Sequence, residues 1–201
     1  MPTIEHSVLS GSELHEPKGI SSASDGQIYV ANGAGSGEWK YEPTGWGYYQ
    51  DNGTDQVIGT SPIRLSIDGG GPLTNTTYLP PVIRGTGNLW DTTADAITPV
   101  SLGDGYTMRL DLPITAKSGT PTELTIQFDI SGAATPTTVI LSRYFGLSKT
   151  PPYTLTFSMP LVVLTEIVVT NGIQLFCNVD SGSVTVAKPS ITLLRLHSGD
   201  L

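Results

Sequence analysis

The chain has 201 residues, with 18 acidic and 10 basic side chains, a formal net charge of −8 and a pI near 4.6. An acidic surface repels phosphate backbones, which argues against nucleic-acid binding. No stretch provides the roughly 20 apolar residues that a membrane-spanning helix needs, so no membrane partner is expected. Residues 1–6 lack the basic and apolar segments of a signal peptide, which predicts a protein that is made in a cytoplasm and remains soluble.

Residues 1–50 are rich in small and turn-forming residues, with one short strand predicted at 27–31. They lack an apolar set large enough for a core. We therefore expect an N-terminal arm that packs against another surface, either its own domain or a larger assembly. Its aromatic side chains are candidate anchors at a protein contact, or a sugar-stacking platform: Trp39, Tyr41, Trp46, Tyr48 and Tyr49.

Residues 51–201 are expected to form one all-β domain. The part up to residue 100 is rich in loops, whereas apolar and polar residues alternate around 106–112, 124–130, 153–159 and 173–179. This period of two places one face of each strand in a core and predicts an antiparallel β-sandwich or barrel with at most one helical turn. The expected core includes Leu110, Ile126, Phe128, Leu155, Phe157, Leu175 and Val186.

Two predicted strands, Leu161–Val169 and Ile191–Leu196, are apolar on both faces. In a two-layer sandwich only one face of a strand lies in the core, so the second face needs a cover. A subunit interface would supply that cover, and so would loops from residues 51–100. The candidate interface residues are Val163, Ile167, Leu194 and Leu196.

No catalytic or metal-binding pattern is evident. The three histidines have no metal-ligand spacing, and the single cysteine, Cys177, lies in an apolar run that predicts a buried, inert thiol. We expect no enzymatic activity, cofactor or metal. The carboxylates that come nearest to a glycosidase pair are Asp91, Asp95, Asp104 and Asp111, but any acidic protein offers such pairs.

The stretch 11–39 contains Leu14-His15-Glu16-Pro17-Lys18-Gly19, Tyr29-Val30-Ala31 and a glycine-rich Gly33–Gly37 ahead of Trp39. It resembles a leader found in tailed-phage virion proteins. The resemblance implies a structural virion protein, made in the host cytoplasm and carried on the virion surface as a capsid decoration or head fibre. Its partner would be the major capsid protein or another virion protein. The candidate attachment residues are His15, Pro17, Tyr29, Trp39 and Trp46.

The strand pattern after residue 100 resembles the trimeric jelly rolls typified by tumour-necrosis-factor-like domains. This resemblance implies a jelly-roll sandwich and a homotrimer. Two other functions remain open at this stage. The chain is also compatible with a tail-associated receptor-binding module that recognises host surface glycan, and with a depolymerising enzyme whose groove is formed between subunits.

Overall fold

The computed structural model describes residues 23–24, 27–31, 37–85 and 87–198. The attachment candidates His15 and Pro17 lie outside these ranges. The chain divides into two compact units, Met1–Glu42 and Pro43–Leu201.

The first unit contains a β-hairpin of β1 (Gln27–Ala31) and β2 (Gly37–Tyr41). Tyr29 lies opposite Trp39, and their rings meet edge to face at 5.2 Å. A Cβ at Gly37 would lie 2.7 Å from the Tyr29 ring, so the hairpin closes only with glycine there. A two-stranded hairpin by itself is marginally stable in water, so this unit depends on further contacts.

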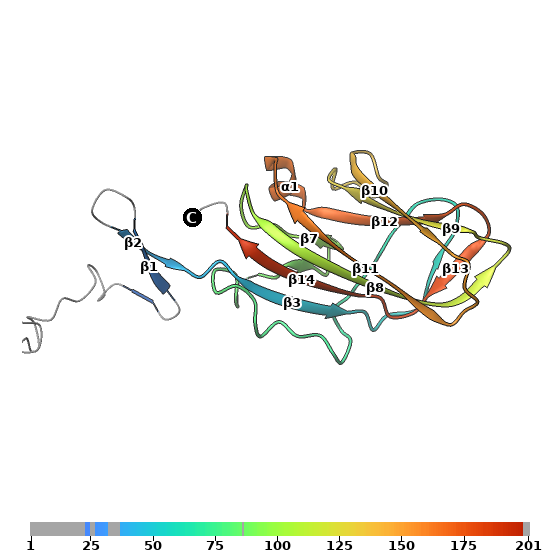
Figure 1. Cartoon of the computed structure of the whole chain (residues 1–201), viewed down its shortest axis with the longest axis horizontal. Helices are drawn as coiled ribbons and strands as arrows, with labels where there is room; N and C mark the ends of the chain where they lie inside the picture. The colour runs from blue at the N-terminus through green and yellow to red at the C-terminus, as the bar shows by residue number, and fades with distance from the viewer. Residues whose placement is uncertain (1–22, 25–26, 32–36, 86, 199–201) are drawn as a thin grey trace, which may run out of the picture. The chain divides into compact units, whose positions relative to one another are not determined.

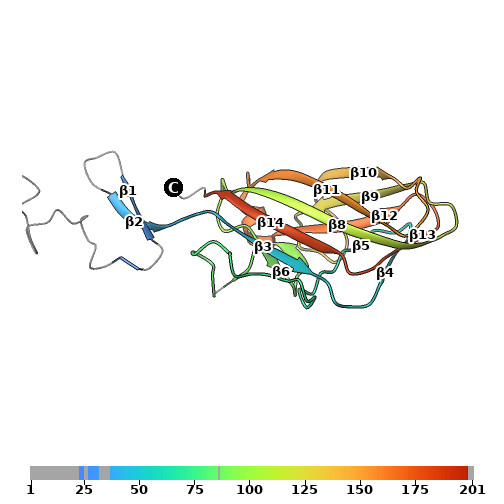
Figure 2. The ribbon, with the colours of Figure 1, turned by 60° about the horizontal axis from the view of Figure 1, so that its bottom comes forward.

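The second unit is a sandwich of two antiparallel sheets with one short helix, α1 (Glu166–Asn171) (Figure 1). The same two layers are seen after rotation in Figure 2. Its strands are β3 (Gly45–Gln50), β4 (Gln56–Ile58), β5 (Ile63–Arg64), β6 (Trp90–Asp91), β7 (Ala96–Ile97), β8 (Gly105–Ser118), β9 (Glu123–Asp129), β10 (Val139–Gly146), β11 (Tyr153–Val162), β12 (Ile173–Val179), β13 (Ser183–Val186) and β14 (Ser190–His197).

The strand order is that of a jelly roll. One sheet runs β3-β14-β8 with β11 on the other side of β8, and the other runs β10-β9-β12 with β5 on the far side of β12. The strands β4 and β13 continue β3 and β14 along β8. The eight principal strands thus alternate between the sheets in the two-Greek-key pattern of a jelly roll. The predicted all-β antiparallel sandwich is confirmed.

The core lies between the sheets and includes most of the predicted residues. Leu110, Ile126, Phe128, Leu175 and Val186 are fully buried there, and Cys177 is buried with them. Leu155 and Phe157 are only partly buried, although both pack against the core. They lie on β11, whose outer edge has no strand partner among the described residues, so their side chains reach the open side of the sandwich.

The prediction of a strand over Leu161–Val169 is wrong beyond its first two residues. The strand β11 ends at Val162, and α1 begins at Glu166 after the N-cap Thr165. Glu166 in the first turn complements the helix dipole. Gly172 ends the helix with a positive φ of 72°, where a Cβ would lie 2.7 Å from the carbonyl oxygen of Ile97. The helix, at six residues, is slightly longer than the single turn expected.

The boundary of the arm also differs from the expected residue 50. Residues 45–50 form β3, which pairs with β14 over six positions and belongs to the sandwich. The separate N-terminal unit therefore ends at Glu42. Trp46, Tyr48 and Tyr49, which the sequence analysis placed in the arm, lie in the sandwich.

Candidate self-association surface

The solvent side of the β3-β14-β8-β11 sheet is built from three rows of cross-strand neighbours. Directly opposite residues on antiparallel strands project from the same face, so the register defines each row. The first row is Trp46, Leu194, Thr107 and Pro160; the second is Tyr48, Thr192, Arg109 and Ser158; the third is Gln50, Ser190, Asp111 and Thr156. Proline is tolerated in the first row because β11 is an edge strand.

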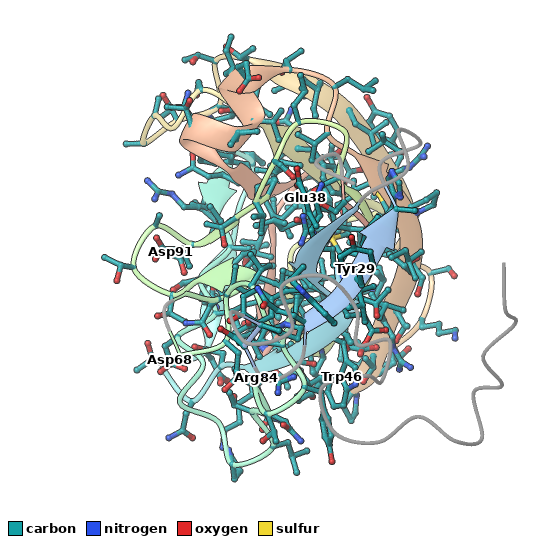
Figure 3. All side chains as sticks on the ribbon, turned by 90° about the vertical axis from the view of Figure 1, so that its left-hand side faces the viewer. Tyr29, Glu38, Trp46, Asp68, Arg84 and Asp91 are labelled. Carbon is teal, nitrogen blue, oxygen red and sulfur yellow. The ribbon has the colours of Figure 1, made fainter. Side chains whose placement is uncertain are left out.

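The first row forms the apolar end of this face. Trp46 lies opposite Leu194 and stacks on Tyr78 with ring centroids 5.2 Å apart. Tyr78 is itself 55% exposed. In the end-on view of Figure 3, Asp68 and Asp91 lie on the opposite side of the sandwich end from Trp46. The apolar row is thus separated from these loop carboxylates.

The three rows together carry no net charge. Arg109 and Asp111 are the charged residues in them, and they form an ion pair with a nitrogen-to-oxygen distance of 3.0 Å. Thr156 donates a further hydrogen bond to Asp111. In a chain with a net charge of −8, this face is one on which two copies can meet without electrostatic repulsion.

Beyond the first row, the end of the sandwich exposes an apolar patch, here called the end patch. Its members lie on the turn before β8, at the end of β11, in α1 and at the end of β14, which Figure 1 shows at one end of the sandwich. The exposed residues are Leu102 (43%), Val162 (60%), Leu164 (77%), Ile167 (52%) and Leu196 (52%).

Backbone hydrogen bonds hold the segments of the end patch together. Val163 donates its N–H to the carbonyl of Asp104, and its own carbonyl accepts from the N–H of Gly103. The next pairs along are Val162 opposite Gly105, and Gly105 opposite His197. Leu196 lies at the register shift between Arg195 and His197, so it bulges from the sheet beside Gly105.

A buried ion pair lies beneath the end patch. Arg195 donates to both oxygens of Asp104, at 2.6 and 3.1 Å, and the two side chains are 2% and 0% exposed. Tyr106 donates to the same carboxylate at 2.6 Å, and Ser101 donates through both its hydroxyl and its N–H. Ser198 adds a further acceptor for the guanidinium at 3.1 Å.

The hydrogen bonds of this network shift the pKa values of Asp104 and Tyr106. Burial by itself would raise the pKa of Asp104, but hydrogen bonds from Arg195, Tyr106 and Ser101 outweigh it and hold the pKa well below its ordinary value. The pKa of Tyr106 is raised, because burial and the neighbouring carboxylate both disfavour the phenolate. Asp104 is therefore a structural anion at neutral pH.

The four residues predicted to lie at an interface differ in how far they are exposed. Val163 is 1% exposed and belongs to the subunit core, so a direct role at an interface is not available to its side chain. Ile167 and Leu196 are about half exposed, and Leu194 lies partly buried in the first row. The structure brings Leu194 next to Trp46, a residue that sequence reasoning had assigned to attachment. Tyr29 and Trp39 lie in the separate hairpin.

Sequence reasoning missed Leu102, Val162, Leu164 and Tyr78 as surface residues. Leu164 and Val162 lay in the run interpreted as a strand, and the Thr165–Glu166 cap signal that ends this strand was available but not used. Leu102 and Tyr78 are isolated in loop-rich sequence, where no periodicity indicates a face.

The carboxylates considered for catalysis have structural partners. Asp91 accepts hydrogen bonds from the N–H groups of Thr93 and Ala94, and Asp95 accepts from Ser66 and Ile67. Asp104 and Asp111 belong to the ion pairs described above. Within the described ranges, no group of three or more His, Cys, Asp or Glu side chains is arranged to hold a metal ion. The described helix is also too short to span a membrane.

The chain is distantly similar to solved structures that include a phage vertex protein and a TNF domain. No protein-family model matches the sequence, and no curated protein matches it. The PRD1 vertex protein P5 is similar at a TM-score of 0.48 and 14% identity, over 98% of this chain and 100% of that chain. Eiger TNF from S. frugiperda is similar at a TM-score of 0.40 and 10% identity, over 79% of this chain and 96% of that chain. At identities this low neither likeness bears on function, and the fold assignment rests on the strand order.

Proposed function

We propose that this chain is a structural protein of a tailed-phage virion, a capsid decoration or head fibre. Its jelly roll self-associates as a homotrimer, and residues 1–42 attach it to the major capsid protein or another virion protein on the particle surface. The leader resemblance in residues 11–39 supports the phage context. The two-unit division supports a separate attachment arm.

The observation that carries the self-association is the character of the β3-β14-β8-β11 face. It is free of net charge in an acidic chain, and its first row contains the partly buried Trp46 and Leu194 beside the exposed Pro160. Trp and Tyr are the residues most enriched at the centres of protein interfaces. Closed symmetry buries the same apolar surface in each copy, which accounts for a chain that leaves such a face uncovered.

The test separates the arm from the sandwich. A variant that lacks residues 1–42 retains β3 and the whole core, so it should fold. Light scattering should give three times the mass of this shortened chain, which is smaller than the 21.2 kDa of the full chain. It should no longer bind particles that lack the protein, whereas residues 1–42 fused to an unrelated trimer should bind them. If the truncated sandwich decorates particles as well as the full chain does, attachment lies in the sandwich and the proposal fails.

A second candidate, recognition of host glycan, is favoured by a different surface. On the other sheet, Tyr144 is 65% exposed and lies opposite Thr125, which is 9% exposed. An exposed aromatic ring offers an apolar face on which a sugar can stack. Binding to a panel of immobilised host glycans that Tyr144→Ala abolishes would favour this function.

A further inference from the structure

We propose that a cleft between the edge strands β10 and β11 binds a saccharide that carries a carboxylate, as uronic and sialic acids do. Lys149 pairs with the carboxylate of the ligand, and apolar and hydroxyl side chains of the cleft contact its ring. The inference rests on the second candidate function, glycan recognition, and assigns it a ligand class and a site other than Tyr144. It depends on neither self-association nor attachment.

The cleft lies on the open side of the sandwich. Among the described residues β10 pairs only with β9, and β11 pairs only with β8, so each strand is the edge of its sheet. The rings of Phe145 on β10 and Phe157 on β11 lie 4.9 Å apart between centroids, so the two edges are neighbours. At the end where residues 147–152 join these strands, a cleft of 360 Å³ is present. This volume falls in the range of small-ligand sites, roughly 300–1,000 Å³.

The lining of the cleft combines apolar side chains with hydroxyl groups. Phe145 and Leu155 line it, and both are partly buried against the core. Ser148, Thr154 and Thr156 line it as well, and all three are exposed. A sugar ring has apolar C–H faces and a rim of hydroxyls, so it can pack on the first group and exchange hydrogen bonds with the second.

Tyr153 provides a polar group that the chain leaves without a partner. It lines the cleft, and its hydroxyl oxygen is buried with no hydrogen-bond partner among the described residues. Buried polar groups are usually hydrogen-bonded. Burial also raises the pKa of Tyr153, so the hydroxyl is protonated at neutral pH and can donate. A ligand that enters the cleft can accept this hydrogen bond.

The charge of the cleft indicates an anionic ligand. Its lining contains Lys149 and no carboxylate, although acidic residues outnumber basic residues by 18 to 10 in the whole chain. Lys149 is exposed, and the ion pairs within the described ranges are formed by other basic residues. An exposed cation that no carboxylate of its own subunit neutralises attracts an anion from solution.

A second cation, Lys117, supports the same side of the cleft. Its Nζ lies 5.7 Å from the centroid of the Tyr153 ring. The same Nζ donates a hydrogen bond to the carbonyl of Lys149 at 2.7 Å and another to the carbonyl of Leu147. These bonds hold the connection that carries Lys149 against the sandwich and add positive charge beneath it.

Two carboxylates lie beside residues of the cleft, but neither opposes an acidic ligand there. Asp111 accepts a hydrogen bond from Thr156, and its charge is balanced by Arg109 at 3.0 Å. Glu123 lies opposite Gly146 in the register of β9 and β10. Because Leu124 next to it is buried in the core, Glu123 projects from the outer face of β9.

The lining favours a saccharide over other anions. Phosphate sites typically use arginine forks or the amides at a helix N-terminus, and the residues that line this cleft include neither. The side chain of an acidic peptide would use Lys149 but not the three hydroxyls beside an aromatic ring. A carboxylated sugar uses all of these groups together.

The test measures binding to the full chain by isothermal titration calorimetry. The probes are trigalacturonate and 3′-sialyllactose, and their neutral counterparts are methyl-esterified trigalacturonate and lactose. At least one acidic probe should bind, and its neutral counterpart should bind about tenfold more weakly or not at all. Lys149→Gln should raise the dissociation constant about tenfold or more, whereas Lys149→Arg, which keeps the charge, should restore binding.

Three further variants separate this cleft from other sites. Tyr153→Phe should weaken binding without lowering the melting temperature, because the hydroxyl that it removes has no partner in the chain. Tyr144→Ala should leave binding unchanged, since Tyr144 and Phe145 project from opposite faces of β10. Lys40→Gln removes one positive charge from the other compact unit and should also leave binding unchanged.

The outcomes that overturn the inference are distinct from those that bear on glycan recognition elsewhere. Failure of both acidic probes to bind refutes the cleft as a site for carboxylated sugars. Loss of binding in Tyr144→Ala with full binding in Lys149→Gln places the glycan on the Tyr144 surface and refutes the cleft alone. Equal binding of inorganic phosphate or of hexaglutamate, lost in Lys149→Gln, refutes the saccharide as the ligand class.

Discussion

The buried Asp104–Arg195 pair makes the strongest prediction about stability. Replacement of Asp104 by alanine leaves the guanidinium of Arg195 buried with no opposing charge, since that side chain is only 2% exposed. The same change removes the acceptor for the Tyr106 hydroxyl and for the N–H groups of Val100 and Ser101. Loss of one partner of a buried pair costs about 3–5 kcal/mol.

This loss is large relative to the total stability of a domain, which is about 5–15 kcal/mol. For a chain of this size, each kcal/mol shifts the melting temperature by about 2–4 °C, so Asp104→Ala should melt about 6–20 °C below the wild type. Urea unfolding followed by tryptophan fluorescence, at one fixed protein concentration, measures the free energy directly. The concentration must be fixed because self-association adds to apparent stability.

The matched control is Asp111→Ala, which breaks an ion pair on the sheet surface. Its partner Arg109 is 57% exposed, so this change should cost no more than about 1 kcal/mol. The double variant Asp104→Leu with Arg195→Met removes both buried charges and should recover most of the stability lost in Asp104→Ala. If Asp104→Ala proves no more destabilising than Asp111→Ala, the buried pair does not stabilise the fold as argued.

Three further predictions follow from single positions. The pKa of Asp104 in the folded state lies below the ordinary value of about 3.9. The stabilisation that its charged form contributes is therefore complete above that pH and is lost on acidification. In urea titrations, the difference in the free energy of unfolding between wild type and Asp104→Asn should narrow below about pH 4. Burial raises the pKa of the Cys177 thiol to about 12, so a maleimide should label it only after unfolding. Rapid labelling of the native protein would contradict its burial. Cys177→Ala should lower the free energy of unfolding by on the order of 1 kcal/mol. Gly182 has a φ of 60°, and a Cβ there would lie 2.1 Å from the Ser118 carbonyl oxygen, so Gly182→Ala should lower the melting temperature. Gly59→Ala is the control and should not lower it, because a Cβ at Gly59 meets nothing within 4 Å. Equal melting temperatures of the two variants would count against the turn geometry.

The sequence by itself was enough to establish the fold class and much of the core. The alternation in 106–112, 124–130 and 173–179 matches β8, β9 and β12, and its apolar residues are buried. This succeeds because a strand exposes its two faces in strict alternation, so a local pattern reports directly which side chains face the core. The buried state of Cys177 followed from the same local reasoning.

Local patterns failed where the environment is set by the ends and edges of the sheets. Leu155 and Phe157 alternate correctly, yet they remain partly exposed because β11 is an edge strand on the open side of the sandwich. The apolar run 161–169 contains both the end of β11 and the start of α1, because Val163 is held by the turn at 103–104 rather than by a strand. Apolar composition by itself does not distinguish a short strand from a short helix.

The candidate surface was decided by tertiary structure alone. Trp46 and Leu194 are 148 positions apart in the sequence but directly opposite in the sheet, and the sequence analysis had assigned them to different roles. The end patch joins three segments through the hydrogen bonds of Val163 and the salt bridge between Asp104 and Arg195. Pairing register and long-range ion pairs depend on how distant segments meet, and the periodicity of a single segment carries no information about its partner.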